Sequence, residues 1–155
     1  MERDIYVVAD SSGSFNECGK NYLQIYLLDA IVNALESQTI KCNTEFRYVL
    51  WNTEMSEYTP GSMFKFSGRA ELSTLESFIS DINDGSLVIL LSDGNYDGDT
   101  MMLQTLLKMK NIIFIPFAVG ADADEISLRV LTDDMTVYST ANLISVIKKI
   151  ILENV

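Results

Sequence analysis

The sequence contains no histidine among its 155 residues. Catalytic sites that pair a serine or a cysteine with a histidine base therefore cannot be built from this chain, and neither can a zinc site with histidine ligands. The two cysteines, Cys18 and Cys42, are too few for a four-cysteine zinc site. They lie far apart with no motif around either, which favours reduced, partly buried thiols over a disulfide.

Positive charge is also scarce, because 11 lysines and arginines stand against 22 aspartates and glutamates, a formal net charge of −11. Nucleic-acid binding needs clustered basic side chains, so we expect no nucleic-acid partner. A basic partner or a bound cation fits this charge better, although an acidic surface can also simply keep a protein in solution.

Long apolar runs are missing as well. None approaches the roughly 20 residues that span a bilayer, and residues 1–4 lack the basic and apolar pattern of a signal peptide. We therefore expect a cytoplasmic protein without a membrane partner.

What the sequence does contain is an alternation of strand-like and helix-like segments. Apolar residues make up 48% of the chain, enough to bury a core as one domain over residues 1–155. Short apolar runs predict strands, and apolar side chains at helical spacing predict helices. The expected strands are Ile5–Ala9, Phe46–Trp51, a short one near Glu57–Thr59, Leu87–Leu91, Ile112–Phe117 and Val137–Tyr138. The expected helices run from about Asn16 to Leu35, over 72–82, around 103–107, from about 122, and over 143–151.

Strands separated by helices indicate a mostly parallel sheet with helices on both faces, a three-layer, doubly wound α/β sandwich of the Rossmann-like kind. We predict about six strands in the order 3-2-1-4-5-6, with strand 3 antiparallel. In such sheets a ligand site lies beyond the carboxyl ends of the strands, where the strand order reverses. The loops that follow Ile5–Ala9 and Leu87–Leu91 are therefore the place to look for a site.

Both of these loops carry oxygen-bearing side chains. Asp10, Ser12 and Ser14 follow the first strand, and Asp93 follows the fourth. Two carboxylates and two hydroxyls in one crevice form an all-oxygen donor set, which hard cations such as Mg²⁺ prefer. Each loop alone has a simpler explanation, in which Ser12 or Ser14 caps the following helix and Asp93 makes a turn. Their meeting at the reversal point favours a metal site.

The same residues resemble a known family. The pattern Asp10-x-Ser12-x-Ser14 after an apolar strand is similar to the metal-ion-dependent adhesion site of von Willebrand factor type A domains, and residues 90–94, Leu-Leu-Ser-Asp-Gly, resemble that family's second signature. The order of strands and helices looks like the same fold over essentially the whole chain. The resemblance implies that the two serines bind Mg²⁺ (or Mn²⁺ or Ca²⁺) directly, that Asp10 and Asp93 support it, and that a protein partner supplies a carboxylate to the metal.

One position departs from the family pattern. The family has a metal-binding threonine in a Gly-Thr step before the third helix, and the matching stretch here places Ala70 at that position with Arg69 beside it. A metal bound at this site would then have one protein ligand fewer than in the family. Arg69 offers an alternative arrangement, in which its guanidinium pairs with Asp10 or Asp93 and neutralises the crevice without a metal. Otherwise Arg69 points to solvent.

The resemblance implies a metal-dependent protein-binding module and not an enzyme. The alternatives are a degenerate, metal-free scaffold and a Mg²⁺-dependent enzyme of phosphoryl transfer. A haloacid-dehalogenase-type phosphatase needs a second aspartate where Ser12 stands, and a receiver domain needs a lysine after its fifth strand, where the sequence reads Pro116-Phe117. Both departures argue against catalysis.

Overall fold

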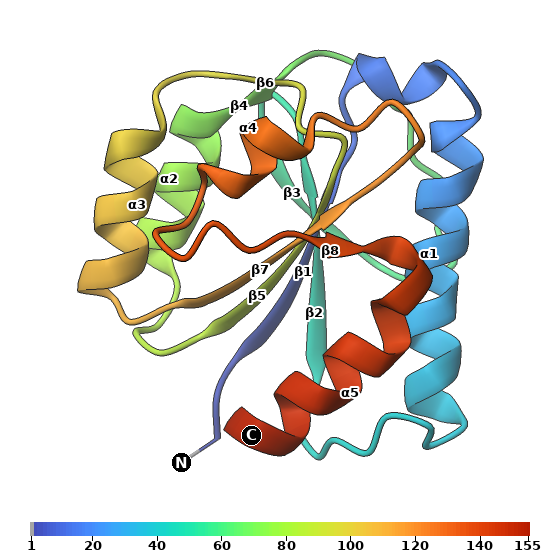
Figure 1. The fold of residues 1–155 in the computed structure, drawn as a ribbon. Helices are drawn as coiled ribbons and strands as arrows, with labels where there is room; N and C mark the ends of the chain where they lie inside the picture. The colour runs from blue at the N-terminus through green and yellow to red at the C-terminus, as the bar shows by residue number, and fades with distance from the viewer. Residues whose placement is uncertain (1) are drawn as a thin grey trace.

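The computed structural model describes residues 2–155 and shows an α/β sandwich built on a six-stranded sheet (Figure 1). The strand order is β3-β2-β1-β5-β7-β8, and β3 runs antiparallel to β2 while the other pairs are parallel. The strands are β1 (Ile5–Asp10), β2 (Phe46–Trp51), β3 (Met55–Tyr58), β5 (Leu87–Ser92), β7 (Ile113–Ala118) and β8 (Tyr138–Ser139). Counted within the sheet, this is the order 3-2-1-4-5-6, so the predicted fold class is confirmed.

Helices cover both faces of the sheet (Figure 1). Val7 and Ile89 belong to the core on one face and their neighbours Val8 and Leu90 to the core on the other, because successive strand side chains point to opposite faces. In residues 2–155 no helix is both long enough and apolar enough to cross a membrane. The first face is covered by α1 (Lys20–Glu36) and α5 (Leu143–Asn154), and the second by α2 (Leu72–Asp81), α3 (Thr100–Met109) and α4 (Glu125–Arg129).

The first helix begins later than predicted. A 3-10 turn covers Gly13–Asn16, and Cys18 and Gly19 then adopt positive φ angles of 55° and 72° before α1 starts at Lys20. Residues in the left-handed conformation cannot continue a right-handed helix, so the predicted start at Asn16 is wrong. Cys18 is also exposed instead of partly buried, and it is a free thiol.

A second, two-stranded sheet was not predicted. In it β4 (Ala70–Glu71) pairs in parallel with β6 (Tyr96–Asp97), and Ala70 lies opposite Tyr96. Two-residue strands have no periodicity that a sequence pattern could reveal. This pairing brings the loop before α2 beside the loop after β5 and closes one side of the candidate site.

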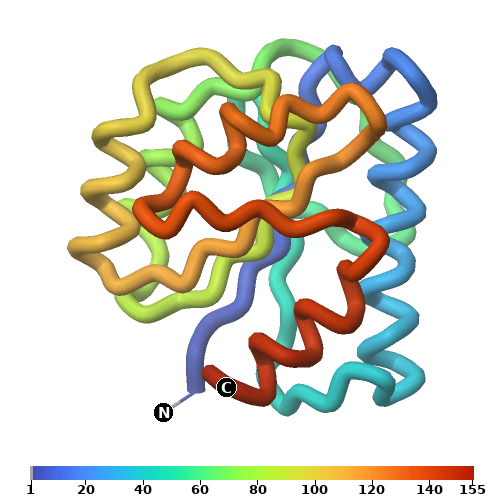
Figure 2. The backbone as a smooth tube through the Cα atoms, in the orientation of Figure 1, coloured from blue at the N-terminus to red at the C-terminus, as the bar shows by residue number. Residues whose placement is uncertain are grey.

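The loop that follows β1 and the end of α5 lie at opposite edges of the sheet (Figure 2). Arg3, just before β1, donates from Nε to the carbonyl oxygen of Asn154 at 2.9 Å, which ties the last helix to the amino edge. The loops that follow β1 and β5 leave the sheet at the carboxyl edge, where doubly wound sheets hold their ligands.

Candidate metal centre

The two neighbouring strands β1 and β5 end together at the candidate site. They pair in parallel with Ala9 opposite Leu91, so that Asp10 and Asp93 leave the same edge of the sheet. The helices that follow these strands, α1 and α3, pack on opposite faces, which makes this the reversal point. Gln24 of α1 ties the strand ends together, because its Nε2 donates to the carbonyl oxygens of Asp10 at 3.0 Å and Leu91 at 2.9 Å.

Asp10 is fully buried at the end of β1. Its Oδ1 accepts hydrogen bonds from the amide of Ser12 at 2.9 Å and the hydroxyl of Ser12 at 2.6 Å, and its Oδ2 accepts from the hydroxyl of Ser92 at 2.7 Å. Burial raises the pKa of Asp10 to about 7, because desolvation and the charge of Asp93 outweigh the hydrogen bonds that lower it. A cation next to this carboxyl would favour its charged form.

The hydroxyls of Ser12 and Ser14 lie between the two aspartates. Their Oγ atoms are 3.2 Å apart, and Ser14 donates to Oδ2 of Asp93 at 2.7 Å, as Ser12 does to Asp10. Each aspartate therefore accepts the hydroxyl hydrogen bond of one serine, and the lone pairs of both serine oxygens stay available. Ser12 precedes the 3-10 turn without a side-chain cap, and Gly19 is the N-cap of α1. The explanation of the two serines as helix caps is therefore wrong.

The loop that carries the serines is held from two sides. The amide of Gly13 donates to the carbonyl oxygen of Gly68 at 2.9 Å. Phe15 is fully buried, and its ring stacks on that of Phe66 with 5.6 Å between centroids. These contacts fix the direction of the serine side chains before any ligand arrives.

Asp93 makes a turn and contacts the serine loop at the same time. Its Oδ1 accepts from the amide of Asn95 at 3.0 Å, the turn expected for it. Its Oδ2 accepts from Ser14 and also from the ammonium of Lys20 at 2.9 Å. The turn and the contact with Ser14 thus occur together.

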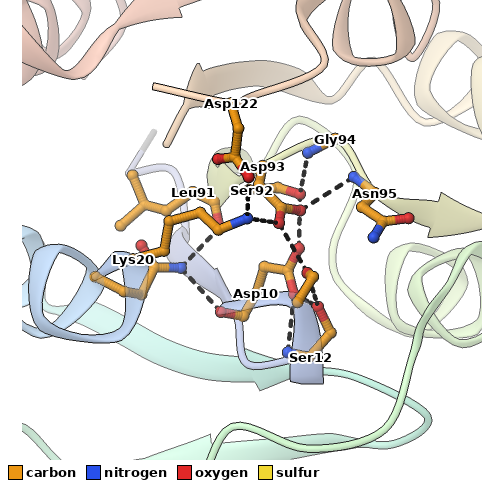
Figure 3. A network of polar contacts seen from close by, with 11 residues as sticks. Asp10, Ser12, Lys20, Leu91, Ser92, Asp93, Gly94, Asn95 and Asp122 are labelled. Atoms are coloured by element: carbon orange, nitrogen blue, oxygen red, sulfur yellow. Dashed lines mark hydrogen bonds and ion pairs between the residues drawn. The ribbon is translucent and has the colours of Figure 1, made fainter. Parts of the chain in front are cut away.

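Lys20 brings a buried positive charge into the site (Figure 3). Its Nζ lies 2.9 Å from Oδ2 of Asp93 and 2.9 Å from Oδ2 of Asp122, and its side chain is 4% exposed. Burial lowers the pKa of Lys20, but the hydrogen bonds and charges of the two aspartates outweigh it and leave that pKa above its ordinary value. The hydrogen bond from Lys20 also lowers the pKa of Asp122.

Sequence reasoning missed Lys20. With the helix predicted to begin at Asn16, a lysine one turn later is expected on a solvated face. The true start of α1 places Lys20 in the first turn, where a cation opposes the helix dipole and needs an anionic partner. The signal that could have found it was the Gly19-Lys20 step, since a glycine there favours a break before the helix.

Arg69 and Ala70 lie beside the site and contribute no ligand to it. Ala70 is 1% exposed and borders the cleft that Ser12 and Ser14 line. The side chain of Arg69 is 79% exposed, and its Nη1 lies 3.2 Å from Oδ2 of Asp97. The alternative in which Arg69 neutralises Asp10 or Asp93 is therefore wrong, and Lys20 supplies the positive charge instead.

The site is a mixed carboxylate and hydroxyl centre. Within residues 2–155 no three histidine, cysteine, aspartate or glutamate side chains come together as they would in a carboxylate-rich or thiolate metal site. Ser12 and Ser14 instead line a cleft of about 490 Å³, and each is oriented by a buried aspartate to which it is hydrogen-bonded, Asp10 or Asp93. Glu17, Asp122 and Asp124 add negative charge to a second, adjoining cleft, which Lys20 also lines. A donor set of oxygens under negative potential suits a hard cation.

Neither a protein-family model nor a curated protein sequence matches this chain. Solved structures do match. The ArnB paralog VWA2 from Sulfolobus acidocaldarius is 19% identical with a TM-score of 0.70, over 96% of this chain and 45% of that one. Von Willebrand factor type A from Catenulispora acidiphila is 15% identical with a TM-score of 0.70, over 99% of this chain and 42% of that one.

Proximal thread matrix protein 1 from the mussel byssus, in a structure with a zinc-occupied MIDAS (metal-ion-dependent adhesion site) motif, is 15% identical with a TM-score of 0.65, over 97% of this chain and 47% of that one. These similarities show that the chain has the von Willebrand factor type A fold, as its motifs led us to expect. The chain spans less than half the length of each of these three proteins.

Proposed function

We propose that this chain is a protein-binding module that works through a divalent cation held by Ser12 and Ser14, with Asp10 and Asp93 in support. The observation that carries the proposal is the separation of the two serine oxygens, 3.2 Å. Neighbouring ligands of an octahedral Mg²⁺ ion, each about 2.1 Å from it, lie about 3 Å apart. Because both serine hydroxyls donate their hydrogen bonds to the aspartates, the lone pairs of both oxygens can act as metal ligands.

The donor chemistry supports Mg²⁺ first, with Mn²⁺ and Ca²⁺ as alternatives. All four side chains offer oxygen, which these hard cations prefer. The ion would balance the buried charge of Asp10 and Asp93, which repel each other. The zinc-occupied motif in the mussel protein supports the general idea of a divalent ion at this place in the fold.

The partner that fits this site is a protein with an acidic side chain. With Ala70 at the family's threonine position, the shell has room for a ligand from outside. The net charge of −11 repels an acidic group, so such a group would dock only where a bound cation attracts it. A nucleic-acid partner does not fit this negative charge. A cytoplasmic setting, expected from the sequence, stays a prediction.

We propose no catalytic role for the two serines. A serine nucleophile needs a base that takes its proton and passes it on. Here each serine hydroxyl donates to a buried carboxylate, Asp10 or Asp93, and this carboxylate also holds a loop through a backbone amide. The second candidate function, a metal-free scaffold, is favoured by one observation, the ammonium of Lys20 beside Asp93. Measured metal binding separates the two candidates.

Thermal unfolding should show a metal-dependent gain in stability. At a Mg²⁺ concentration about 100 times its Kd, a site that exists only in the native state stabilises it by about 2.7 kcal/mol relative to chelator. Ser14→Ala should lose this gain, whereas Ser80→Ala, on the exposed side of α2, should keep it. If the wild-type protein melts at the same temperature with chelator and with saturating Mg²⁺, the scaffold function is the correct one.

Restoring the family's threonine should strengthen metal binding. Ala70→Thr places a hydroxyl at the border of the cleft, and we expect the Kd for Mg²⁺ to fall by about tenfold, the worth of one added charge-assisted contact. Arg69→Ala should leave the Kd within about twofold, because this side chain pairs with Asp97 at the surface. Calorimetric titration measures both. An unchanged Kd in Ala70→Thr would mean that the match between residues 67–72 and the family loop is out of register.

A further inference from the structure

Lys20 is placed where helix stability gives no reason for it. It is the first residue of α1, and its side chain is 4% exposed. A cation in the first turn of a helix faces the positive end of the dipole, and a lysine is almost never fully buried unless it is paired. Contacts in the candidate site, and not the stability of the helix, must therefore explain why a lysine is buried at this position.

The surrounding fold is shaped around the lysine side chain. Gly120 has φ +95°, and a Cβ atom there would lie 2.7 Å from Cδ and 2.8 Å from Cγ of Lys20. Any side chain at position 120 would displace the lysine stem. On another side the ring of Phe15 lies 5.7 Å from Nζ, within the range of a cation–π contact. These neighbours hold the ammonium against Asp93.

Lys20 and Ser14 share one acceptor. Oδ2 of Asp93 accepts from the hydroxyl of Ser14 at 2.7 Å and from the ammonium of Lys20 at 2.9 Å. A cation held by Ser14 would therefore share the charge of Asp93 with a positive group that is already in place. Two like charges around one carboxylate repel, and the repulsion is strong in a buried site.

We propose that Lys20 is a tethered cation, which keeps the serine–aspartate site assembled in the metal-free protein and lowers its affinity for divalent metal. This inference rests on the proposed function and adds its regulation. Lys20 pairs with the two carboxylates of Asp93 and Asp122, so its ammonium already cancels half of the negative charge that these two groups offer to a divalent ion. The site then fills only when the metal is abundant enough to overcome the internal charge.

Calorimetric titration with Mg²⁺ alone tests this on the full chain. Lys20→Met keeps a stem of similar length without the charge, and Lys149→Met removes the same charge from an exposed position on α5. We expect Lys20→Met to bind Mg²⁺ at least about tenfold more tightly than wild type, and Lys149→Met to stay within about twofold. In chelator, Lys20→Met should melt several degrees below wild type, since Asp93 loses its partner.

The outcomes distinguish the proposed role of Lys20 from the proposed metal binding itself. A Kd for Lys20→Met that equals or exceeds that of Lys149→Met overturns the tethered-cation role, while measurable wild-type binding leaves the proposed function standing. No binding by any of the proteins overturns both. If Lys20→Met does not fold, Asp122→Asn replaces it, because it removes a negative charge at a half-exposed position and should weaken Mg²⁺ binding by about threefold or more. Unchanged or tighter binding by Asp122→Asn overturns the role as well.

Discussion

Asp93→Ala is expected to abolish metal binding and to lower the free energy of unfolding in chelator by about 3 kcal/mol. Asp93 is buried and accepts from Ser14 and Lys20. Without it, the ammonium of Lys20 stays buried with Asp122 as its remaining carboxylate. Breaking a buried ion pair by removing one partner is costly, and here the half-exposed Asp122 compensates the remaining ammonium only in part.

Urea unfolding in chelator and a Mg²⁺ titration measure the two effects of Asp93→Ala separately. Asp133→Ala is the matched control, since it also removes one carboxylate, but Asp133 is 57% exposed, pairs with Lys108 and does not line the cleft. Exposed pairs contribute at most about 1 kcal/mol, so this variant should unfold nearly as wild type does and keep its metal response. A metal-dependent melting shift in Asp93→Ala would contradict the placement of the site.

Gly94→Ala is expected to destabilise the fold by about 3 kcal/mol or more. Gly94 has φ +80°, and a Cβ atom there would lie 2.4 Å from the carbonyl oxygen of Asp124. That backbone cannot easily move away, because the amide of Asp124 donates to the carbonyl oxygen of Asp93 at 2.8 Å. The substitution therefore combines an unfavourable φ with a clash against a fixed backbone.

Gly61→Ala separates these two causes. Gly61 has a similar φ of +88° but nothing within 4 Å of its added Cβ, so only the conformational cost of about 1 kcal/mol should appear. Urea unfolding of both variants measures the difference between them. Equal destabilisation by Gly94→Ala and Gly61→Ala would show that the loop after β5 does not pack against the start of α4 as described.

The sheet could be predicted from the sequence because its central strands are apolar along their whole length. The runs that became β1 and β5 fit strands covered on both faces, and helices between successive strands indicate parallel pairing. The pairing of β4 with β6 could not be predicted, since two residues carry no pattern. The delayed start of α1 depends on left-handed conformations at Cys18 and Gly19, and of these two residue types only glycine indicates such a conformation in the sequence.

The oxygen-bearing side chains of the candidate site could be predicted from the sequence, but the side chain that brings a positive charge into it could not. Asp10, Ser12 and Ser14 follow one strand and Asp93 follows its neighbour, so the topology alone brings them together. The direction of a long side chain depends on tertiary contacts that the sequence does not display. Arg69 was therefore a reasonable candidate for the cation in the crevice, although it points to Asp97 at the surface.

Lys20 occupies that role because of contacts from distant parts of the chain, of which the sequence shows only the glycine before it. Gly19 breaks the chain before α1, and Gly120 leaves room for the lysine stem. A charged side chain on a helix usually lies in solvent. Lys20 is an exception because two aspartates from distant loops contact its ammonium.

Anomalous diffraction from crystals grown with Mn²⁺ tests the metal site most directly, because manganese can be located without assuming which side chains hold it. We expect one strong peak beside the hydroxyl oxygens of Ser12 and Ser14, at the open cleft next to Ala70. Crystals of Ser14→Ala should lack this peak. A peak at another place on the protein, or none at saturating Mn²⁺, would contradict a metal-dependent binding site at these residues.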